Sequence, residues 1–389
     1  MSDASPSTGN SAYFGPGSKS TSGTILLVVL GGGMLVAIVS LAYSSYRFTR
    51  EKADLQAAQN RLVMQHGLID PVGRQLAPLY VDQNGDSLAD PPSDPRQQLD
   101  PDTLVVAYYR DADADTQPVA WEDFQAHLAQ ATGKQVTCQE YYNTANELDA
   151  IKAGAIQVIA LHAADTPYLV NNAGFVPVAV VGTQAAAHGN HLVMAVKAKS
   201  DIKKLADVRG RTLTCTMPDS ITGYRAAVAV LWREVGLRPD VDYAVQFSHG
   251  QKRSVLGVAA GEFEVAALSY EKLQNMLQKG SVAAGDYRVI FESQPIPHLT
   301  FGYVHNIKPE LAAQITSAAL DFANAAGPID EATGAPLRFY PIDYRKDFEF
   351  VRRIDDTFDP RIHRRPPEMP EPAPDADLKS ALDAEPESD

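Results

Sequence analysis

Residues 211–226 read RTLTCTMPDSITGYRA and combine a strand, a turn and the beginning of a helix. The run TLTCT has the β-branched residues typical of a strand, and Pro-Asp-Ser is typical of a turn. The first N–H groups of a helix lack partners within it, and Ser220 and Thr222 add two hydroxyl donors. Gly223 leaves space for a ligand to approach the backbone. The stretch predicts an anion site, although helix capping by Ser220 explains the same residues without a ligand.

The sequence on both sides of this stretch alternates between strand and helix patterns. One series covers 103–194 and resumes over 296–354, and a second covers 195–295. Extended crossings near 191–197 and 292–298 connect the two series. The alternation predicts an α/β protein with two parallel-sheet, Rossmann-like lobes joined by a two-strand hinge. In such folds, ligands bind outside the carboxyl ends of the strands, where helices begin.

Composition excludes several classes of protein. The net charge of −14 is concentrated near the end of the chain, where residues 366–389 hold eight acidic residues and one lysine. This acidity, without a basic patch, argues against nucleic acid as a partner. We expect residues 355–389 to form a disordered, acidic, proline-rich tail. The chain has two cysteines, Cys138 and Cys215, which exclude a disulfide framework and a cysteine metal site.

The N-terminal part predicts a membrane anchor. Residues 24–43, TILLVVLGGGMLVAIVSLAY, are twenty uncharged residues, enough for one transmembrane helix after a disordered tail over 1–23. A cleaved secretory signal ending at Ala42 is the alternative. Basic residues after the span favour a cytoplasmic body, but long domains cross the membrane largely regardless of charge. We therefore expect the body on the extracytoplasmic side.

Residues 44–102 predict a stalk helix followed by a turn-rich linker. Within the linker, side-chain oxygens alternate as they do in a calcium-binding loop, at Asp82, Asn84, Asp86 and Asp90. Such a loop normally closes with a bidentate glutamate, and Ser93 stands at that position. The sequence thus leaves two interpretations open: a calcium site, or an acidic linker exposed to water.

Six short segments in a fixed order carry a more specific signal. They are Tyr142 followed by KAGAIQVIAL, the segment 202–211, Ser220-Ile221-Thr222-Gly223, Ser248-His249, the segment 261–266, and Ser293-Gln294-Pro295-Ile296-Pro297. In this order they resemble the substrate-binding proteins of phosphonate, phosphite and phosphate ABC transporters. The resemblance extends from Leu104 to Arg353 and implies the architecture of type 2 periplasmic binding proteins.

The resemblance also implies a set of ligand-binding residues. The second lobe would contribute hydroxyl and N–H donors, a histidine and an acceptor carboxylate, and the first lobe a tyrosine. The candidates are Tyr142, Ser220, Ile221, Thr222, Gly223, His249 and Glu264. Tyr141 is an alternative to Tyr142, because strand alternation directs only one of them to the cleft. Departures from the family pattern, such as Gly250 in place of an acid, weaken the expectation of phosphonate specificity.

The sequence therefore predicts a membrane-anchored, extracytoplasmic solute-binding protein that delivers a small oxyanion to an ABC permease. A ligand-sensing or scaffold module with the same fold and no transporter is the alternative. Ser220, His249 and Glu264 could in principle serve as nucleophile, base and acid. No G-x-S-x-G motif surrounds Ser220, however, so we do not expect an enzyme. Apart from the calcium loop, no cofactor is expected.

Overall fold

The computed structural model describes residues 21–69, 73–109, 119–141, 144–182, 190–297, 299–325, 327 and 336–363. The side chains of residues 21–32, 60, 62–64 and 145 are not part of that description. The chain divides into two units, residues 1–60 and 61–389.

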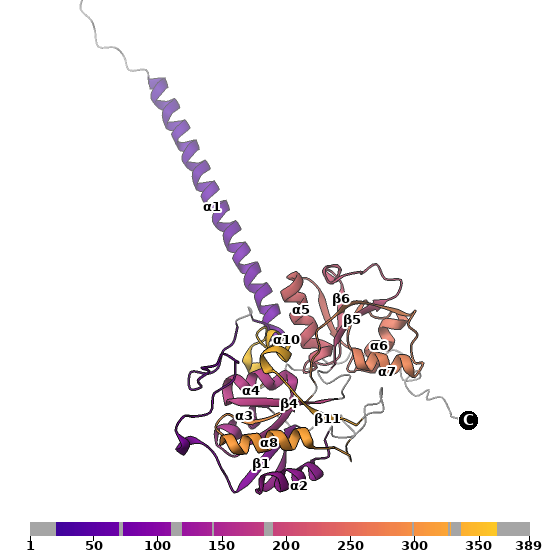
Figure 1. The fold of residues 1–389 in the computed structure, drawn as a ribbon. Coiled ribbons are helices and arrows are strands. Elements are labelled where there is room, and N and C mark those ends of the chain that lie inside the picture. The colour runs from indigo at the N-terminus through magenta and orange to yellow at the C-terminus, as the bar shows by residue number, and fades with distance from the viewer. Residues whose placement is uncertain are drawn as a thin grey trace, which may run out of the picture. The chain divides into compact units, whose positions relative to one another are not determined.

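Most of helix α1 (Thr21–Gln65) lies in the first unit (Figure 1). Its described apolar side chains between Met34 and Phe48 are exposed, from 55% for Ile38 to 72% for Leu41. No helix in the described part of the chain meets the length and hydropathy needed to cross a bilayer. The span expected over residues 24–43 is therefore not confirmed, and the side chains of its first nine residues lie outside the description.

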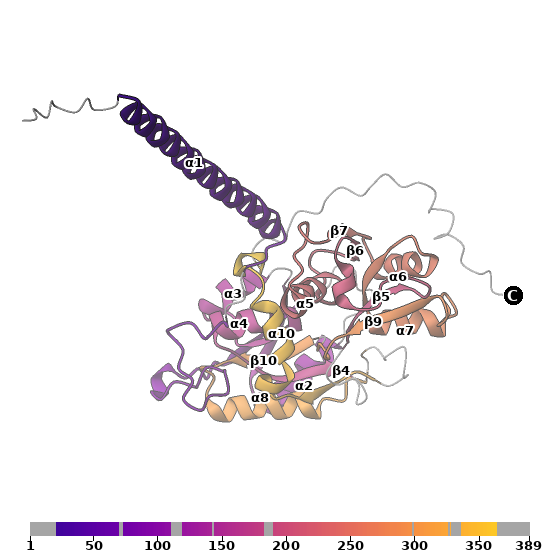
Figure 2. The same ribbon diagram turned by 90° about the horizontal axis from the view of Figure 1, so that it is seen from above.

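The second unit contains two sheets, each with its own helices (Figures 1 and 2). We call the first sheet and its helices the first subdomain. Its strands follow the order β11-β4-β10-β3-β1-β2. They are β1 (Thr103–Tyr109), β2 (Gln135–Tyr141), β3 (Val158–His162), β4 (Phe175–Gly182), β10 (Leu299–Val304) and β11 (Arg338–Pro341). The helices are α2 (Trp121–Thr132), α3 (Thr144–Lys152), η2 (Ala163–Asp165), α4 (Thr166–Ala173) and α8 (Pro309–Asp321).

The core of the first subdomain forms around α2. Trp121, Phe124 and Leu128 recur at helical spacing and are all buried. The ring of Phe124 lies 5.4 Å from that of Phe301 on β10, and it also contacts Phe322 and Phe339. The helix ends where Gly133 adopts a left-handed conformation.

The second subdomain has a five-stranded sheet in the order β7-β6-β8-β5-β9. Its strands are β5 (Leu192–Lys197), β6 (Thr212–Cys215), β7 (Ala244–Phe247), β8 (Val265–Ser269) and β9 (Tyr287–Glu292). Its helices are η3 (Leu205–Val208), η4 (Ile221–Arg225), α5 (Ala226–Val235), α6 (Gln251–Ala260) and α7 (Tyr270–Gln278). Strand β5 is buried on both faces: Met194 and Val196 join the main core, and Val193 and Ala195 join a second core with α6 and α7.

The α/β class is confirmed, but the expectation of wholly parallel sheets is wrong. In the first sheet, β10 runs antiparallel to both β3 and β4, and in the second, β5 runs antiparallel to β8 and β9. Both strands directly follow a crossing between the sheets, so each enters its sheet in the opposite direction to its βαβ neighbours. A mixed sheet results in each subdomain.

Two connections join the sheets. Strand β5 already belongs to the second sheet at Leu192, earlier than the predicted boundary after residue 194. The first connection therefore precedes β5, and its residues 183–189 lie outside the description. Asn190 in the first connection pairs antiparallel with Ile296 in the second. The two connections thus run side by side, and their action as a hinge stays a prediction.

The C-terminal segment packs on both subdomains. It contains α9 (Tyr344–Asp347), α10 (Glu349–Asp355) and η5 (Pro360–His363), and α10 contacts α4 and η2 as well as α5. Phe358 is 1% exposed and pairs with Leu68. The disordered tail predicted from residue 355 therefore starts too early, because residues 355–358 contribute to the core. Residues 364–389 lie outside the description.

The linker before β1 is also packed on the body. The guanidinium of Arg74 lies 2.6 Å from the carboxylate of Asp355, and the Arg74 N–H donates to Asp356 at 2.9 Å. The short helix η1 (Pro95–Gln97) is capped by Asp94, whose side chain accepts the Arg96 N–H.

Candidate functional site

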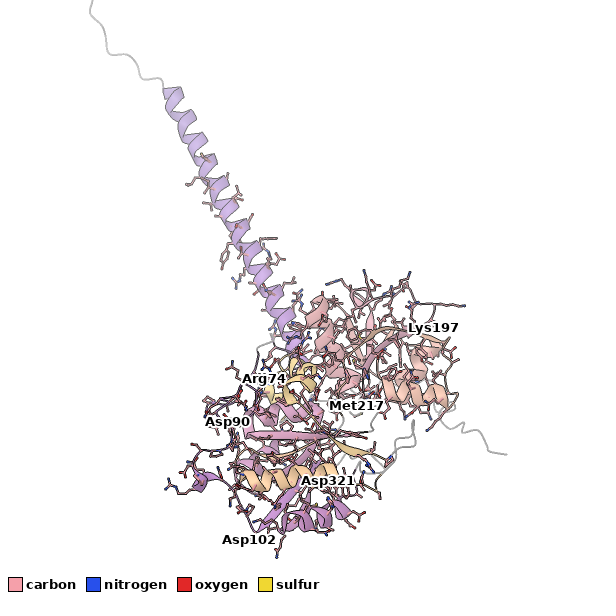
Figure 3. The ribbon with its side chains drawn as sticks, viewed as in Figure 1. Arg74, Asp90, Asp102, Lys197, Met217 and Asp321 are labelled. Atoms are coloured by element: carbon pink, nitrogen blue, oxygen red, sulfur yellow. The ribbon has the colours of Figure 1, made fainter. Side chains whose placement is uncertain are left out.

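The predicted helix start lies at the carboxyl edge of the second sheet. Strands β6 and β7 are parallel and end side by side, with Cys215 opposite Phe247. Beyond them, the N–H of Ser248 donates to the carbonyl of Cys215 at 2.8 Å, and that of His249 to Thr216 at 3.0 Å. The turn after β6 therefore lies next to His249. Figure 3 labels Met217 in this turn, on the side of the second subdomain that faces the first.

The turn leads into η4, which is a single turn of π-helix. The N–H of Arg225 donates to the carbonyl of Ser220, five residues earlier, at 3.0 Å. The Ser220 Oγ caps the turn by accepting the Gly223 N–H at 3.0 Å. Because a hydroxyl both accepts and donates, the Ser220 proton stays available to an oxyanion. The N–H groups of Ile221 and Thr222 precede the first helical hydrogen bond, so they have no acceptor within the helix.

Gly223 has a different role from the one expected. A Cβ at this position would overlap Thr216 Oγ1 and approach Ser220 Oγ within 2.8 Å. The glycine is therefore required for the turn to pack on β6, rather than to let a ligand approach. Within the described structure, the buried Thr216 hydroxyl has no hydrogen-bond partner.

We expect the substitution Gly223→Ala to destabilise the protein by roughly 1–3 kcal/mol, because the added methyl group is forced into a packed turn. Gly250→Ala is the matched control at the same edge of the sheet, where a Cβ meets no atom within 4 Å. Thermal unfolding of the two variants should show a lower Tm for Gly223→Ala alone. Equal melting temperatures would contradict the packing role.

His249 is held in an unusual backbone conformation. Its φ of 63° is left-handed, which is uncommon for a residue other than glycine. Its N–H is fixed by the carbonyl of Thr216, so the ring projects from a restrained position beside the turn. Strained conformations of this kind are often found at functional sites. The ligand contact predicted for His249 is compatible with this placement and stays a prediction.

Glu264 does not lie at this edge. It directly precedes β8, which is parallel to β6, so it lies at the amino edge of the sheet, opposite Ser220. Its carboxylate accepts the Thr212 N–H at 2.8 Å and lies 3.3 Å from the Arg211 guanidinium. Lys197, labelled in Figure 3, ends β5 at this same far edge. The expected ligand contact of Glu264 is thus not supported by its position. A nucleophile, base and acid set is not assembled either.

Tyr142, the candidate from the first lobe, lies outside the described residues. Its neighbour Tyr141 ends β2 and packs, half-buried, against the core. Tyr141 therefore lies at the carboxyl edge of the first sheet.

A polar cluster that the sequence did not reveal lies at that edge. It combines α3, which follows β2, with η2, which follows β3. The Thr144 hydroxyl donates to the Asp165 carboxylate at 2.9 Å, and Arg225 of η4 reaches the same carboxylate, with Nη1 3.6 Å from Oδ1. Beside them, Glu147 is 1% exposed. Burial, with a further contribution from the negative charge of Asp165, raises the pKa of the Glu147 carboxyl to about 8. The raised pKa therefore favours the protonated form of Glu147 at neutral pH.

η4 also contacts the start of the linker, directly after α1. The buried Tyr224 hydroxyl lies 2.9 Å from His66 Nδ1, and His66 Nε2 lies 2.7 Å from the Asp240 carboxylate. Burial is the main reason that the pKa of the Tyr224 hydroxyl is strongly raised, so it stays protonated. This linker contact and the polar cluster fix two consecutive residues of η4, Tyr224 and Arg225.

The predicted calcium loop is a hydrogen-bonded turn. Asp82 accepts the N–H groups of Gly85 and Ser87, and Asp86 accepts that of Leu88. Asn84 and Asp90 likewise accept backbone N–H groups of the loop. In the part of the chain that the structure describes, no three His, Cys, Asp or Glu side chains are grouped to hold a metal ion. The calcium site stays a prediction.

The fold and the position of the site define a class of protein. The protein has two α/β subdomains joined by two adjacent connections, and the η4 helix start of the second subdomain faces the first. This is the architecture of type 2 periplasmic binding proteins. XAC2383 from Xanthomonas citri bound to ATP has this fold, with a TM-score of 0.52 and 17% identity over 66% of this chain and 99% of its own. The same protein bound to chloride gives a TM-score of 0.51 and 15% identity, with the same coverage.

A third solved structure, PhnD1 from Prochlorococcus marinus in complex with methylphosphonate, has a TM-score of 0.47 and 12% identity, covering 67% of this chain and 100% of its own. No curated protein matches the chain. Residues 106–339, more than half of the chain, match the family model of the phosphonate ABC transporter periplasmic substrate-binding protein. The chain belongs to this family, as its six sequence segments indicate.

Proposed function

We propose that this periplasmic substrate-binding protein binds a small phosphonate- or phosphate-type oxyanion between its two subdomains and delivers it to an ABC permease. The observation that carries the proposal is the start of η4. Two hydroxyl groups and the N–H groups of Ile221 and Thr222 gather there, at a sheet edge that faces the first subdomain. Oriented N–H and O–H donors are the groups that bind an oxyanion in proteins.

The geometry supports recognition by hydrogen bonds. The Ser220 Oγ already accepts the Gly223 N–H, so its proton is left to point outward to a ligand oxygen. Thr222 is buried, and His249 follows the end of the adjacent strand β7. Closure of the first subdomain over the anion would remove water and strengthen each of these bonds. The ligand would then be enclosed until the permease opens the cleft.

Native mass spectrometry of the full-length protein, purified without phosphate buffers, tests the proposal. We expect a mass increment that corresponds to one small oxyanion per chain and disappears after partial unfolding and refolding. Phosphate, phosphite, methylphosphonate and ATP are then added back to the stripped protein. Failure of all four to bind would contradict the proposed ligand class.

The alternative of a sensor or scaffold that serves no transporter is favoured by the link between His66 and the η4 residue Tyr224. A ligand that shifts η4 would also act on the end of α1. Uptake of the bound oxyanion by cells with and without the gene distinguishes the two functions. Loss of uptake supports the importer, and unchanged uptake with retained binding supports the sensor.

We also propose that residues 24–43 anchor the protein in the membrane. Support comes from their twenty uncharged residues and from the exposed apolar side chains of α1 between Met34 and Phe48. Membranes washed at alkaline pH should retain the full-length chain and release a chain that begins at residue 61. Release of the full-length chain into the wash would contradict the anchor.

A further inference from the structure

Among the described residues, an ion pair connects the two subdomains where their carboxyl edges face each other. Arg225 ends η4 in the second subdomain, and Asp165 ends η2 in the first. Nη1 of Arg225 lies 3.6 Å from Oδ1 of Asp165, and the two side chains are 10% and 17% exposed. Among the described residues, pairs such as Arg211–Asp201 and Arg353–Glu234 are more exposed, whereas Arg74–Asp355 is similarly buried. The Arg225–Asp165 pair therefore forms in a nearly dry environment, where charges interact strongly and are costly to leave unpaired.

The groups around the pair allow it to form. From α3, the Thr144 hydroxyl donates to the second oxygen of Asp165, and the buried Glu147 lies beside it. The raised pKa of Glu147 favours its uncharged form at neutral pH, which limits the negative charge beside Asp165. An ionised Glu147 would add a second negative charge and repel Asp165. The ion pair brings a charge of η4 next to the opposite charge of η2.

The pair also acts on the anion site through the backbone. The N–H of Arg225 closes the π-turn by donating to the carbonyl of Ser220, whose hydroxyl caps the same turn. A displacement of Arg225 would therefore also move Ser220, the residue whose hydroxyl group is a proposed ligand donor. π-Turns are rare and occur frequently at functional sites.

We propose that Arg225 and Asp165 are positioning residues that hold the two subdomains together around the Ser220 site. The inference rests on the proposed oxyanion-binding function. When the subdomains separate, both charged groups regain water, so the open protein tolerates loss of the pair better than the closed one. Apparent affinity is proportional to the fraction of molecules in the binding-competent state. Removing the pair lowers that fraction and weakens binding without removing a ligand contact.

The chain offers a matched control. Arg353 of α10 and Glu234 of α5 form another ion pair between a helix of the C-terminal segment and the second subdomain, at 2.7 Å. These side chains are 39% and 48% exposed. Exposed ion pairs contribute little to stability, so Glu234→Gln should leave both closure and binding unchanged.

The test uses the full-length protein with nitroxide labels at Glu122→Cys on α2 and Lys272→Cys on α7, both exposed positions. Electron–electron resonance measures the distance between the subdomains, and calorimetry with methylphosphonate and inorganic phosphate measures affinity. In ligand-free protein, Arg225→Gln and Asp165→Asn should each shift the distance distribution to longer values. We expect each substitution to lower the fraction of closed molecules about tenfold, which raises the apparent Kd by the same factor.

The double variant Arg225→Gln/Asp165→Asn should bind no more weakly than the weaker single variant, because both substitutions remove one interaction. The proposal would be overturned if the losses of binding free energy in the two single variants add up in the double variant. It would also be overturned if the label distances in the variants equal those of the wild type. A loss of affinity in Arg225→Gln alone would instead make Arg225 a ligand contact. If the wild type binds neither anion, the proposed function fails, whereas the distances in ligand-free protein still decide whether the pair holds the subdomains together.

Discussion

Glu147→Gln should make the protein's stability much less dependent on pH. The carboxyl is buried in the native state, where its pKa is raised to about 8 from the ordinary 4.5. The folded protein therefore binds this proton more tightly than the unfolded chain does. The contribution of Glu147 to the free energy of unfolding is therefore largest below about pH 4.5, and it declines as the pH rises toward 8. A glutamine cannot ionise, so the decline should be absent in the variant.

The expected magnitude is large for a single side chain. Each unit of pKa difference corresponds to about 1.4 kcal/mol, so the wild type should lose on the order of 3 kcal/mol between pH 5 and pH 7.5 at this site. Urea unfolding at several pH values measures the free energy of unfolding of each protein. The slopes of this free energy against pH are then compared, because a pH-independent destabilisation by the substitution does not change the slope. Asp149→Asn, on the exposed side of the same helix, is the matched control. If the free energy of unfolding changes with pH equally in Glu147→Gln and in the wild type, Glu147 is not a buried glutamate with a raised pKa.

Removing the two hydroxyl donors of η4 should have the largest effect on binding. In Ser220→Ala/Thr222→Val, the oxyanion loses two hydrogen bonds, each worth about 1.5–3 kcal/mol when one partner is charged. We expect affinity to fall at least 100-fold. Thr222→Val alone keeps the Ser220 cap of the turn, so its loss of affinity, about tenfold or more, should come without a large change in Tm.

Ser281→Ala, at an exposed turn of the second subdomain, is the control for this pair of variants. Its affinity should equal that of the wild type. If the double variant binds as tightly as the wild type while remaining folded, the ligand does not bind at the start of η4.

Several features of the fold follow from local sequence patterns. The spacing of Trp121, Phe124 and Leu128 predicts α2, and the stretch 211–226 predicts a strand, a turn and a helix. The position of the site at a carboxyl edge follows from the βαβ rule. Strand direction does not follow in the same way. A buried strand such as β5 has a nearly continuous apolar pattern whether it runs parallel or antiparallel, so only the path of the chain between the sheets decides it.

The site was harder to predict where it depends on contacts between distant residues. Glu264 precedes its strand, and its family position alone does not show that this end lies opposite Ser220. Glu147 lies beside Leu148 and four residues before Ile151, on the buried face of α3, but a glutamate at such a position is normally expected at the boundary with water. Asp165 and Arg225 are sixty residues apart and meet only when the sheet edges face each other. For Gly223, the sequence indicates a need for space but not which atoms occupy it.

The central claim is that this chain binds one small oxyanion at the start of η4. Isothermal titration calorimetry of the full-length protein, first stripped of bound anions, tests it most directly, with phosphate, phosphite and methylphosphonate as titrants. We predict saturable binding of at least one of them at one ligand per chain, lost in Ser220→Ala/Thr222→Val and retained in Ser281→Ala. The account is contradicted if none of the three anions binds, or if binding persists unchanged in the double variant.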